Sequence, residues 1–83
     1  MMVKVVFLNL LRSKYGISQI MMNSGTLQEI IDQLLVIHPK IDVKDFMTAV
    51  IFVNQERIDQ LNWNLKTLID GDEVVLTHFV GGG

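Results

Sequence analysis

One stretch of this chain, residues 26–39, restricts the possible folds more than any other. Its apolar side chains recur with helical spacing along a single stripe, at Leu27, Ile30, Ile31, Leu34 and Leu35. Thr26 and Glu29 have the spacing of a capping box, which predicts the first turn of a helix. Pro39 predicts its end, because the residue before a proline is disfavoured in helical conformation. One amphipathic helix can cover only one face of a sheet, so we expect a sheet with this helix against it.

The other apolar segments are short and rich in β-branched residues, which is typical of strands. We expect strands at residues 2–10, 17–22, 49–54, 57–58 and 73–80. The first two should form a hairpin across a polar loop that ends at Gly16. Residues 40–48 are expected to form a loop with room for a helical turn, and residues 62–68 a single helical turn.

The order of these elements predicts the architecture. The first and last strands are the most apolar, which places them side by side at the centre of the sheet. The chain between them contains the helix, so they can run parallel. We therefore expect an α+β domain of residues 1–80 with the β-grasp fold, a mixed sheet on one main helix. Residues 81–83, all glycine, are expected to form a flexible tail.

Composition and charge exclude several classes of protein. Of the 83 residues, 49% are hydrophobic, which argues against disorder. The net charge of −2 supplies no basic field for a nucleic acid. Without cysteine there is no thiolate nucleophile, disulfide or cysteine-based metal site. Because the apolar runs are too short for a membrane span and the start has no cleavage-site pattern, we expect a cytoplasmic protein that binds neither nucleic acid nor membrane.

Strand alternation predicts an apolar surface on the side of the sheet away from the helix. If Val5, Ile51 and Val74 point inward, their neighbours along each strand point outward. Thr77 belongs to this outward set, whose apolar members are Val6, Leu8, Val50, Phe52, Val75 and Phe79. Exposed apolar patches mark partner surfaces. The alternative is that residues 40–48 fold over this face.

The remaining polar candidates have ordinary structural explanations. Glu29 and Asp32 lie on the solvated face of the helix and are not expected to be an acid–base pair. Asp70, Asp72 and Glu73 are typical of a turn, since a calcium loop needs more oxygen ligands over a longer span, so no metal site is expected. His38 at a helix end is structural, and His78 is expected to face solvent on its strand. Tyr15 and Trp63 are expected to pack.

Several segments together resemble the ubiquitin-like sulfur carriers MoaD and ThiS. Residues 7–16 (FLNLLRSKYG) resemble the first strand and loop of MoaD-type carriers, and residues 26–39 their helix and its proline stop. Residues 53–56 resemble their third-strand turn, and DGDEV at 70–74 has the family spacing before the terminal glycines. Chain length favours the MoaD type, whereas the tail HFVGGG at 78–83 is similar to ThiS.

The resemblance implies a function for the last residues. In these carriers an E1-like enzyme uses ATP to adenylate the C-terminal carboxylate, and a sulfur donor converts it to a thiocarboxylate. Here the reacting group would be the carboxylate of Gly83, with Gly82 beside it in the enzyme's channel. Phe79, Val80 and Gly81 would contact the partner together with the outward residues of the sheet. The chain itself would bind no cofactor.

The resemblance leaves four functions open. A MoaD-type chain is the small subunit of molybdopterin synthase, and its acceptor enzyme is the large subunit. A ThiS-type chain delivers sulfur to thiazole synthase for thiamine. In both cases the chain is a co-substrate rather than an enzyme. The third function is a protein modifier that is joined to lysines of its targets. The fourth is a non-covalent β-grasp binding module, because terminal glycines alone also suit a flexible end.

Overall fold

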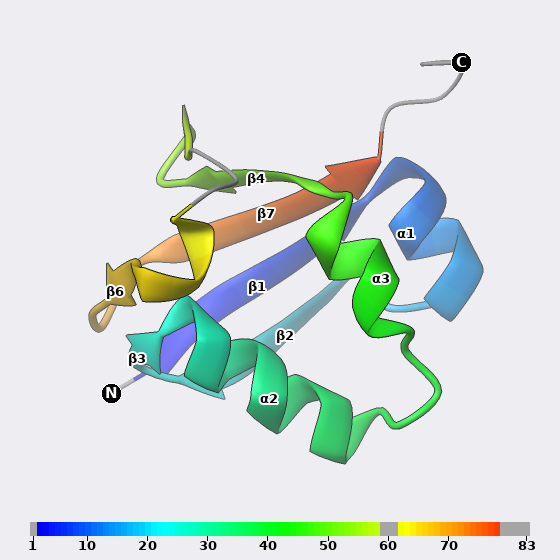
Figure 1. The fold of residues 1–83 in the computed structure, drawn as a ribbon, viewed down its shortest axis with the longest axis horizontal. Coiled ribbons are helices and arrows are strands. Elements are labelled where there is room, and N and C mark those ends of the chain that lie inside the picture. Colours follow the sequence, from blue (N-terminus) through cyan, green and yellow to red (C-terminus); the bar gives the residue numbers. More distant parts are fainter. Residues whose placement is uncertain (1, 59–61, 79–83) are drawn as a thin grey trace.

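The computed structural model describes residues 2–58 and 62–78, and its main feature is a five-stranded mixed sheet (Figure 1). The strand order is β2-β1-β7-β4-β5, and a separate two-stranded sheet joins β3 to β6. The strands are β1 (Met2–Leu8), β2 (Gln19–Asn23), β3 (Gly25–Thr26), β4 (Val50–Val53), β5 (Glu56–Arg57), β6 (Thr67–Leu68) and β7 (Glu73–His78). The helices are α1 (Asn9–Tyr15), α2 (Leu27–Ile37) and α3 (Val43–Met47), with a 3-10 turn at Trp63–Leu65.

The centre of the sheet confirms the predicted topology. β1 and β7 are neighbours and run parallel, with Val5 opposite Val74 and Phe7 opposite Leu76. β4 lies antiparallel on the other side of β7, where Ile51 is opposite Leu76. These residues are all buried, so the side chains that alternation directs inward do form the sheet's contribution to the core. The fold is the expected α+β β-grasp.

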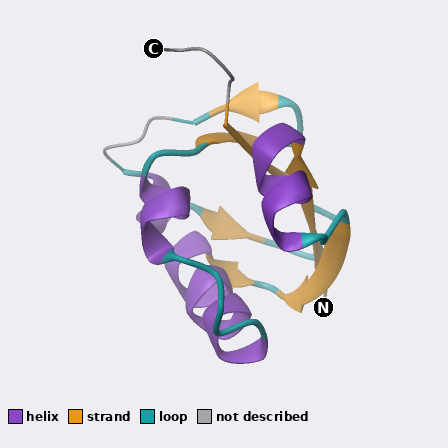
Figure 2. Cartoon of the chain, turned by 90° about the vertical axis from the view of Figure 1, so that its right-hand side faces the viewer, coloured by secondary structure: helices purple, strands orange, loops and turns teal. Residues whose placement is uncertain are grey.

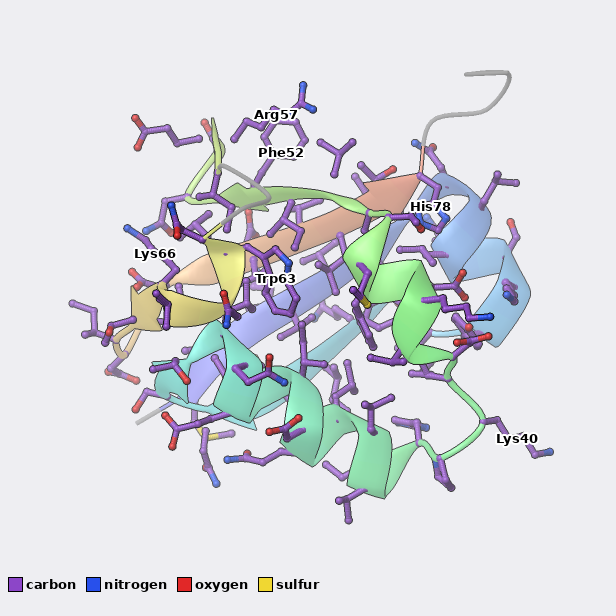
Figure 3. The ribbon with its side chains drawn as sticks, viewed as in Figure 1. Lys40, Phe52, Arg57, Trp63, Lys66 and His78 are labelled. Carbon is purple, nitrogen blue, oxygen red and sulfur yellow. The ribbon has the colours of Figure 1, made fainter. Side chains whose placement is uncertain are left out.

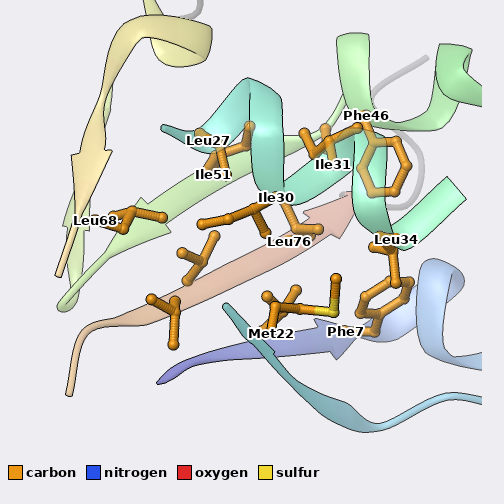
Figure 4. Packing of buried hydrophobic residues seen from close by; sticks show 14 of the residues in the cluster. Phe7, Met22, Leu27, Ile30, Ile31, Leu34, Phe46, Ile51, Leu68 and Leu76 are labelled. Atoms are coloured by element: carbon orange, nitrogen blue, oxygen red, sulfur yellow. The ribbon is translucent and has the colours of Figure 1, made fainter. Parts of the chain in front are cut away.

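Helix α2 confirms the predicted capping box and apolar stripe. The Glu29 backbone N–H donates to the Thr26 hydroxyl at 3.2 Å, and the Thr26 N–H donates to the Glu29 carboxylate at 2.9 Å. The Thr26 hydroxyl also donates to this carboxylate at 3.0 Å, and the two bonds that the carboxylate accepts hold the pKa of Glu29 below its usual value. Four stripe residues are buried, whereas Leu35 is half-buried against the core. Figure 4 shows the stripe meeting Phe7, Met22 and Leu76 of the sheet.

A short helix, α1, replaces the first segment that was expected to be a loop, whereas α3 lies where a helical turn was expected within residues 40–48. The first strand ends at Leu8, two residues early, and residues 9–15 form α1 instead of a simple hairpin loop. Asn9, at φ 54°, turns the chain into α1, and Gly16, at φ 69°, ends it in the left-handed region that favours glycine. Burial of Leu11 in the core accounts for this helix. Strand β2 accordingly begins at Gln19 rather than at residue 17.

The position of helix α3 shows which face of the sheet residues 40–48 cover. Asp42 caps it by accepting from the Lys44 N–H at 2.9 Å, and Phe46 is buried. The ring of Phe46 meets Phe7 edge-on, with centroids 6.5 Å apart. Because Phe7 points inward, α3 packs on the same face as α2 (Figure 2). The alternative in which residues 40–48 fold over the outer face is therefore wrong.

Smaller elements differ from the expectation by a residue or two. β4 spans Val50–Val53, β5 is Glu56–Arg57 rather than 57–58, and the described part of the last strand is Glu73–His78. The helical turn expected within residues 62–68 is present, but Thr67 and Leu68 pair with Gly25 and Thr26 as a second small sheet. In the described residues, no helix is long and apolar enough to cross a membrane.

Candidate functional site

The outer face of the sheet carries the predicted apolar surface. Val6, Val50, Phe52 and Val75 are half-buried and Leu8 is 38% exposed; we call these five residues the outer patch. Register makes the patch continuous, because Val75 lies opposite Val6 of β1 and opposite Phe52 of β4. Helices α2 and α3 pack on the other face. Three adjacent strands therefore present a row of apolar side chains away from the core.

Thr77 interrupts the outer patch between Leu8 and Val50, the residues opposite it on β1 and β4. Alternation directs its side chain outward, yet only 3% of the residue is exposed. The side-chain amide of Asn9 donates to the Thr77 hydroxyl at 2.9 Å. The turn at Asn9 places its side chain over the last residues of β7. Thr77 is thus covered, which strand alternation alone does not reveal.

Charged side chains border the outer patch on two sides. Lys4 and Glu73, which lie two residues before Val6 and Val75 on β1 and β7, form an ion pair at 3.6 Å. Arg57 of β5 lies opposite Phe52, and Figure 3 shows the two side chains together at the top of the sheet. An apolar centre with a polar rim is the usual anatomy of a protein interface.

His78, the last described residue of β7, does not face solvent as expected. Its side chain is half-buried, with Nε2 at 2.9 Å from the Asp45 carbonyl oxygen and 3.0 Å from the Thr48 hydroxyl. The Thr48 hydroxyl donates its own proton to the Lys44 carbonyl at 2.9 Å. Nε2 therefore faces two acceptors and must carry a hydrogen. The contacts anchor the end of β7 to α3.

Asp45 is the centre of a polar cluster that joins α1 to α3. Lys14 donates to its carboxylate at 2.9 Å, and the Tyr15 hydroxyl donates to the same oxygen. The Asp42 N–H donates to the Tyr15 hydroxyl at 3.1 Å. Burial opposes ionisation of Asp45, but the bonds from Tyr15 and Lys14 outweigh it and hold its pKa below the usual value. Tyr15 packs as expected and also has this polar role.

The lowered carboxylate pKa values predict a loss of stability in acid. The pKa values of Glu29, Asp45 and Asp72 all lie below their usual values in the folded protein. Their stabilising effect is therefore complete above the unfolded-state pKa, about 4, and is lost as pH falls through the lower folded values. Urea unfolding from pH 7 to 2.5 should show a falling free energy only below about pH 4.5, and Asp45→Asn should flatten that fall. An acid response unchanged in Asp45→Asn would contradict the assignment.

The other carboxylates have the structural roles expected of them. Asp72 accepts from the Asn54 side chain at 3.0 Å and from the Ile69 N–H at 2.9 Å, and Asp70 accepts from the Met2 N–H at 2.8 Å. These bonds form the predicted turn, in which Gly71 has φ 90°. Asp32 accepts from Gln28 at 2.9 Å. Within residues 2–58 and 62–78, no group of three or more acidic, histidine or cysteine side chains is placed to hold a metal.

The structure thus assembles part of the predicted site. The outer patch brings together Val6, Leu8, Phe52 and Val75, as expected. The predicted contacts at Phe79, Val80 and Gly81, and the reacting end at Gly82 and Gly83, lie outside the described residues. Those residues follow His78 directly, at the end of a central strand that also carries Val75.

Comparison with known proteins places the chain in a family. The ThiS family model matches residues 5–83. A chain of the complex of subunits 1 and 2 of the molybdopterin-converting factor from Helicobacter pylori 26695 is 27% identical, with a TM-score of 0.66 and 100% of both chains covered. SAMP1 from Haloferax volcanii superposes with a TM-score of 0.80 at 18% identity, covering 100% of both chains.

Small archaeal modifier protein 1 from Methanosarcina acetivorans is 23% identical with a TM-score of 0.74, covering 100% of this chain and 99% of that one. At these lower identities the likeness to the two archaeal proteins shows the fold alone. No curated protein sequence matches the chain. The family match spans nearly the whole sequence, and the solved structures share its β-grasp fold. The chain therefore belongs to the ThiS family of ubiquitin-like sulfur carriers.

Proposed function

We propose that this protein is a sulfur carrier whose Gly83 carboxylate is adenylated by an E1-like enzyme and then converted to a thiocarboxylate, which donates sulfur to the pterin precursor in molybdopterin biosynthesis. The observation that carries the proposal is the glycine run at 81–83, which follows a central β-grasp strand in a member of the ThiS family. A chain of the molybdopterin-converting factor complex, 27% identical over its full length, supports the molybdopterin pathway.

The chemistry needs no side-chain nucleophile from this chain. ATP, used by the activating enzyme, converts the Gly83 carboxylate to an acyl adenylate and releases pyrophosphate. Sulfide from the sulfur donor then displaces AMP at the carbonyl carbon and leaves a C-terminal thiocarboxylate. The absence of cysteine from the sequence is compatible with this scheme.

Glycine suits the end of such a chain for a steric reason. A residue without Cβ can pass through a narrow channel and adopt backbone angles closed to other residues. Five residues separate the last described position, His78, from the end of Gly83. Extended at about 3.3–3.6 Å per residue, they reach roughly 17 Å. That length lets the folded body remain outside the partner while the carboxylate enters its active site.

The outer patch is the proposed docking surface for the activating and acceptor enzymes. It lies on β1, β7 and β4, so it is rigidly connected to the strand from which the tail leaves. Its apolar row and charged border suit a protein partner. The acceptor enzyme would be the large subunit of molybdopterin synthase.

Intact mass measurement tests the proposal. The protein is incubated with ATP, the E1-like enzyme and a sulfur donor. We expect an increase of about 16 Da, because sulfur replaces one oxygen of the terminal carboxylate. Conjugates of higher mass would support a protein modifier, and an unchanged mass would favour a non-covalent binding module. Incubating the loaded carrier separately with thiazole synthase and with the molybdopterin-synthase large subunit then identifies the pathway, because only the correct acceptor consumes the thiocarboxylate.

Phe52→Ala is expected to weaken binding to the activating or acceptor enzyme about tenfold or more. An aromatic side chain at an interface contributes more to binding than it does to folding when it is half-buried in the free protein, so the free energy of unfolding should change by less than about 1 kcal/mol. Titration calorimetry measures the affinity, and urea denaturation measures stability. Val36→Ala, at an 81% exposed position on α2, is the matched control and should change neither. A loss of several kcal/mol of stability in Phe52→Ala, with unchanged affinity, would show that Phe52 belongs to the core.

A further inference from the structure

The free edge of β2 has a row of unpaired backbone groups. β2 pairs with β1 on one side and, within the described residues, with no strand on the other. The Phe7 N–H donates to the Ser18 carbonyl at 2.9 Å, so the antiparallel register gives Ile20 and Met22 the bonds to β1. The alternate residues Gln19, Met21 and Asn23 must then direct their N–H and C=O groups outward, away from the sheet.

This edge lacks the features that usually protect an edge strand. Natural sheets protect their edges with charged residues, proline, bulges or very short strands. Residues 15–28 contain no charged residue and no proline, and β2 is five residues long. The opposite edge of the same sheet is protected, because β5 is two residues long and both, Glu56 and Arg57, are charged. The difference suggests that β2 is kept available for pairing.

A cavity lies beside the start of β2. It has a volume of about 540 Å³. Its apolar lining includes Ile17, two residues before β2, Ile37 at the end of α2, and Ile41 in the segment that follows. Lys14 and Lys40 also line it, and the lining contains no carboxylate. Lys14 is paired with Asp45, whereas Lys40 forms no ion pair among the described residues and extends into solvent in Figure 3. The cavity therefore suits an apolar side chain next to an acidic one.

The position of α2 determines what can pair with this edge. α2 contacts β2 and covers the inner face at this side of the sheet (Figure 1). A second copy of this chain pairing edge to edge would place its own β2 about 4.8 Å away, with its own α2 on the same face. Packed helices need axes roughly 8–10 Å apart. A single extended strand brings no helix to this face, whereas a second copy must also place its own helix beside α2.

We propose that the free edge of β2 binds an extended segment of a partner protein by strand addition, with an apolar side chain of that segment in the cavity and acidic residues beside Lys40. Backbone hydrogen bonds to Gln19, Met21 and Asn23 would supply affinity, and the cavity and Lys40 would supply selectivity. The site is at the opposite edge from β4 and β5, so a partner on the outer patch leaves it accessible. It does not depend on the chemistry proposed for Gly83.

A synthetic peptide, acetyl-TIVVTDDED-amide, serves as the probe for the full chain. In ¹⁵N-resolved NMR titrations we expect the amide resonances of Gln19, Met21 and Asn23 to shift. In ¹³C-resolved spectra of the same titration, the methyl resonances of Ile17 and Ile37 should shift as well. The same peptide with lysine in place of every acidic residue should bind at least threefold more weakly. Lys40→Glu should weaken the binding of the acidic peptide about threefold. Lys66→Glu, the matched control at the other end of the molecule (Figure 3), should leave its binding unchanged.

Backbone substitutions test strand addition directly. Met21→Pro removes an N–H that faces outward and none that bonds β1, so the variant should fold and bind about tenfold more weakly. Two N-methylated peptides test the same bonds without altering the protein: one carries N-methyl groups on its odd-numbered residues and the other on its even-numbered residues. Only one of these two sets of N–H groups can face β2, so one of the two peptides should lose binding. Unshifted edge amides, or equal binding of both N-methylated peptides, would overturn the proposal. Edge shifts that depend on protein concentration without peptide would also overturn it, in favour of a second copy.

Discussion

Removing Gly82 and Gly83 is expected to abolish thiocarboxylate formation while leaving the domain folded. The proposed reaction occurs at the carboxylate of Gly83, and a chain two residues shorter places its carboxylate roughly 7 Å short of the position the activating enzyme requires. Appending one alanine after Gly83 should have the same effect, because it moves the carboxylate and adds a Cβ in the channel. The rate of mass increase under the loading conditions measures the effect.

Stability is the necessary control for these tail variants. The described core ends at Leu76 and Thr77, and residues beyond a core rarely contribute much to stability. Urea denaturation should therefore give the truncated and extended chains the same midpoint as the parent within error. Sulfur loading of the truncated chain at the parent rate would refute the carrier proposal. A truncated chain that fails to load and is also unfolded would show instead that the terminal residues are part of the fold.

Leu34→Ala should destabilise the domain by about 2–5 kcal/mol. Leu34 is fully buried at the centre of the α2 stripe, where it packs with Phe7 and Phe46 (Figure 4). Truncation removes apolar contacts and leaves a cavity that the sheet and helices can close only in part. Because a small domain has about 5 kcal/mol of stability or little more, a loss at the upper end of this range would leave much of the variant unfolded at 25 °C. Thermal melting followed by circular dichroism gives the midpoint.

Two companion substitutions separate this cavity effect from changes in helix propensity. Ile31→Val, in the same stripe, should cost about 0.5–1.5 kcal/mol and remain measurable if Leu34→Ala does not fold. Val36→Ala, two residues from Leu34 but 81% exposed, should change stability by less than about 0.5 kcal/mol. Equal melting temperatures for Leu34→Ala and Val36→Ala would show that the stripe does not form the core.

Periodicity explains why the larger elements are predictable. The 3.6-residue stripe of α2 and the period-2 alternation of β1, β4 and β7 each extend over several residues, and the capping box lies within four consecutive ones. The outer patch follows from the same alternation once these three strands are adjacent. Short helices cannot be predicted in this way. α1 and α3 are seven and five residues long, so they have too few turns for a periodic signal.

The candidate docking surfaces differ in how far local sequence predicts them. Val6, Phe52 and Val75 can be assigned to the outer patch from alternation alone. The free edge of β2 could not be inferred in that way, since it depends on which strand is outermost and on the hydrogen-bond phase set by Phe7 and Ser18. The uncharged run at residues 15–28 was the only local signal of it.

By itself, the sequence determined the β-grasp arrangement, the inward and outward faces of the central strands, and the glycine run proposed to carry the chemistry. Tertiary structure alone decided that Phe46 brings α3 onto the inner face against Phe7, that Asn9 covers Thr77, and that His78 bonds to α3. The physical reason is the range of the interactions. Helical and strand periodicities are set by neighbours a few residues apart, whereas these three contacts join residues 30 or more positions apart, and each forms only after the sheet has been assembled.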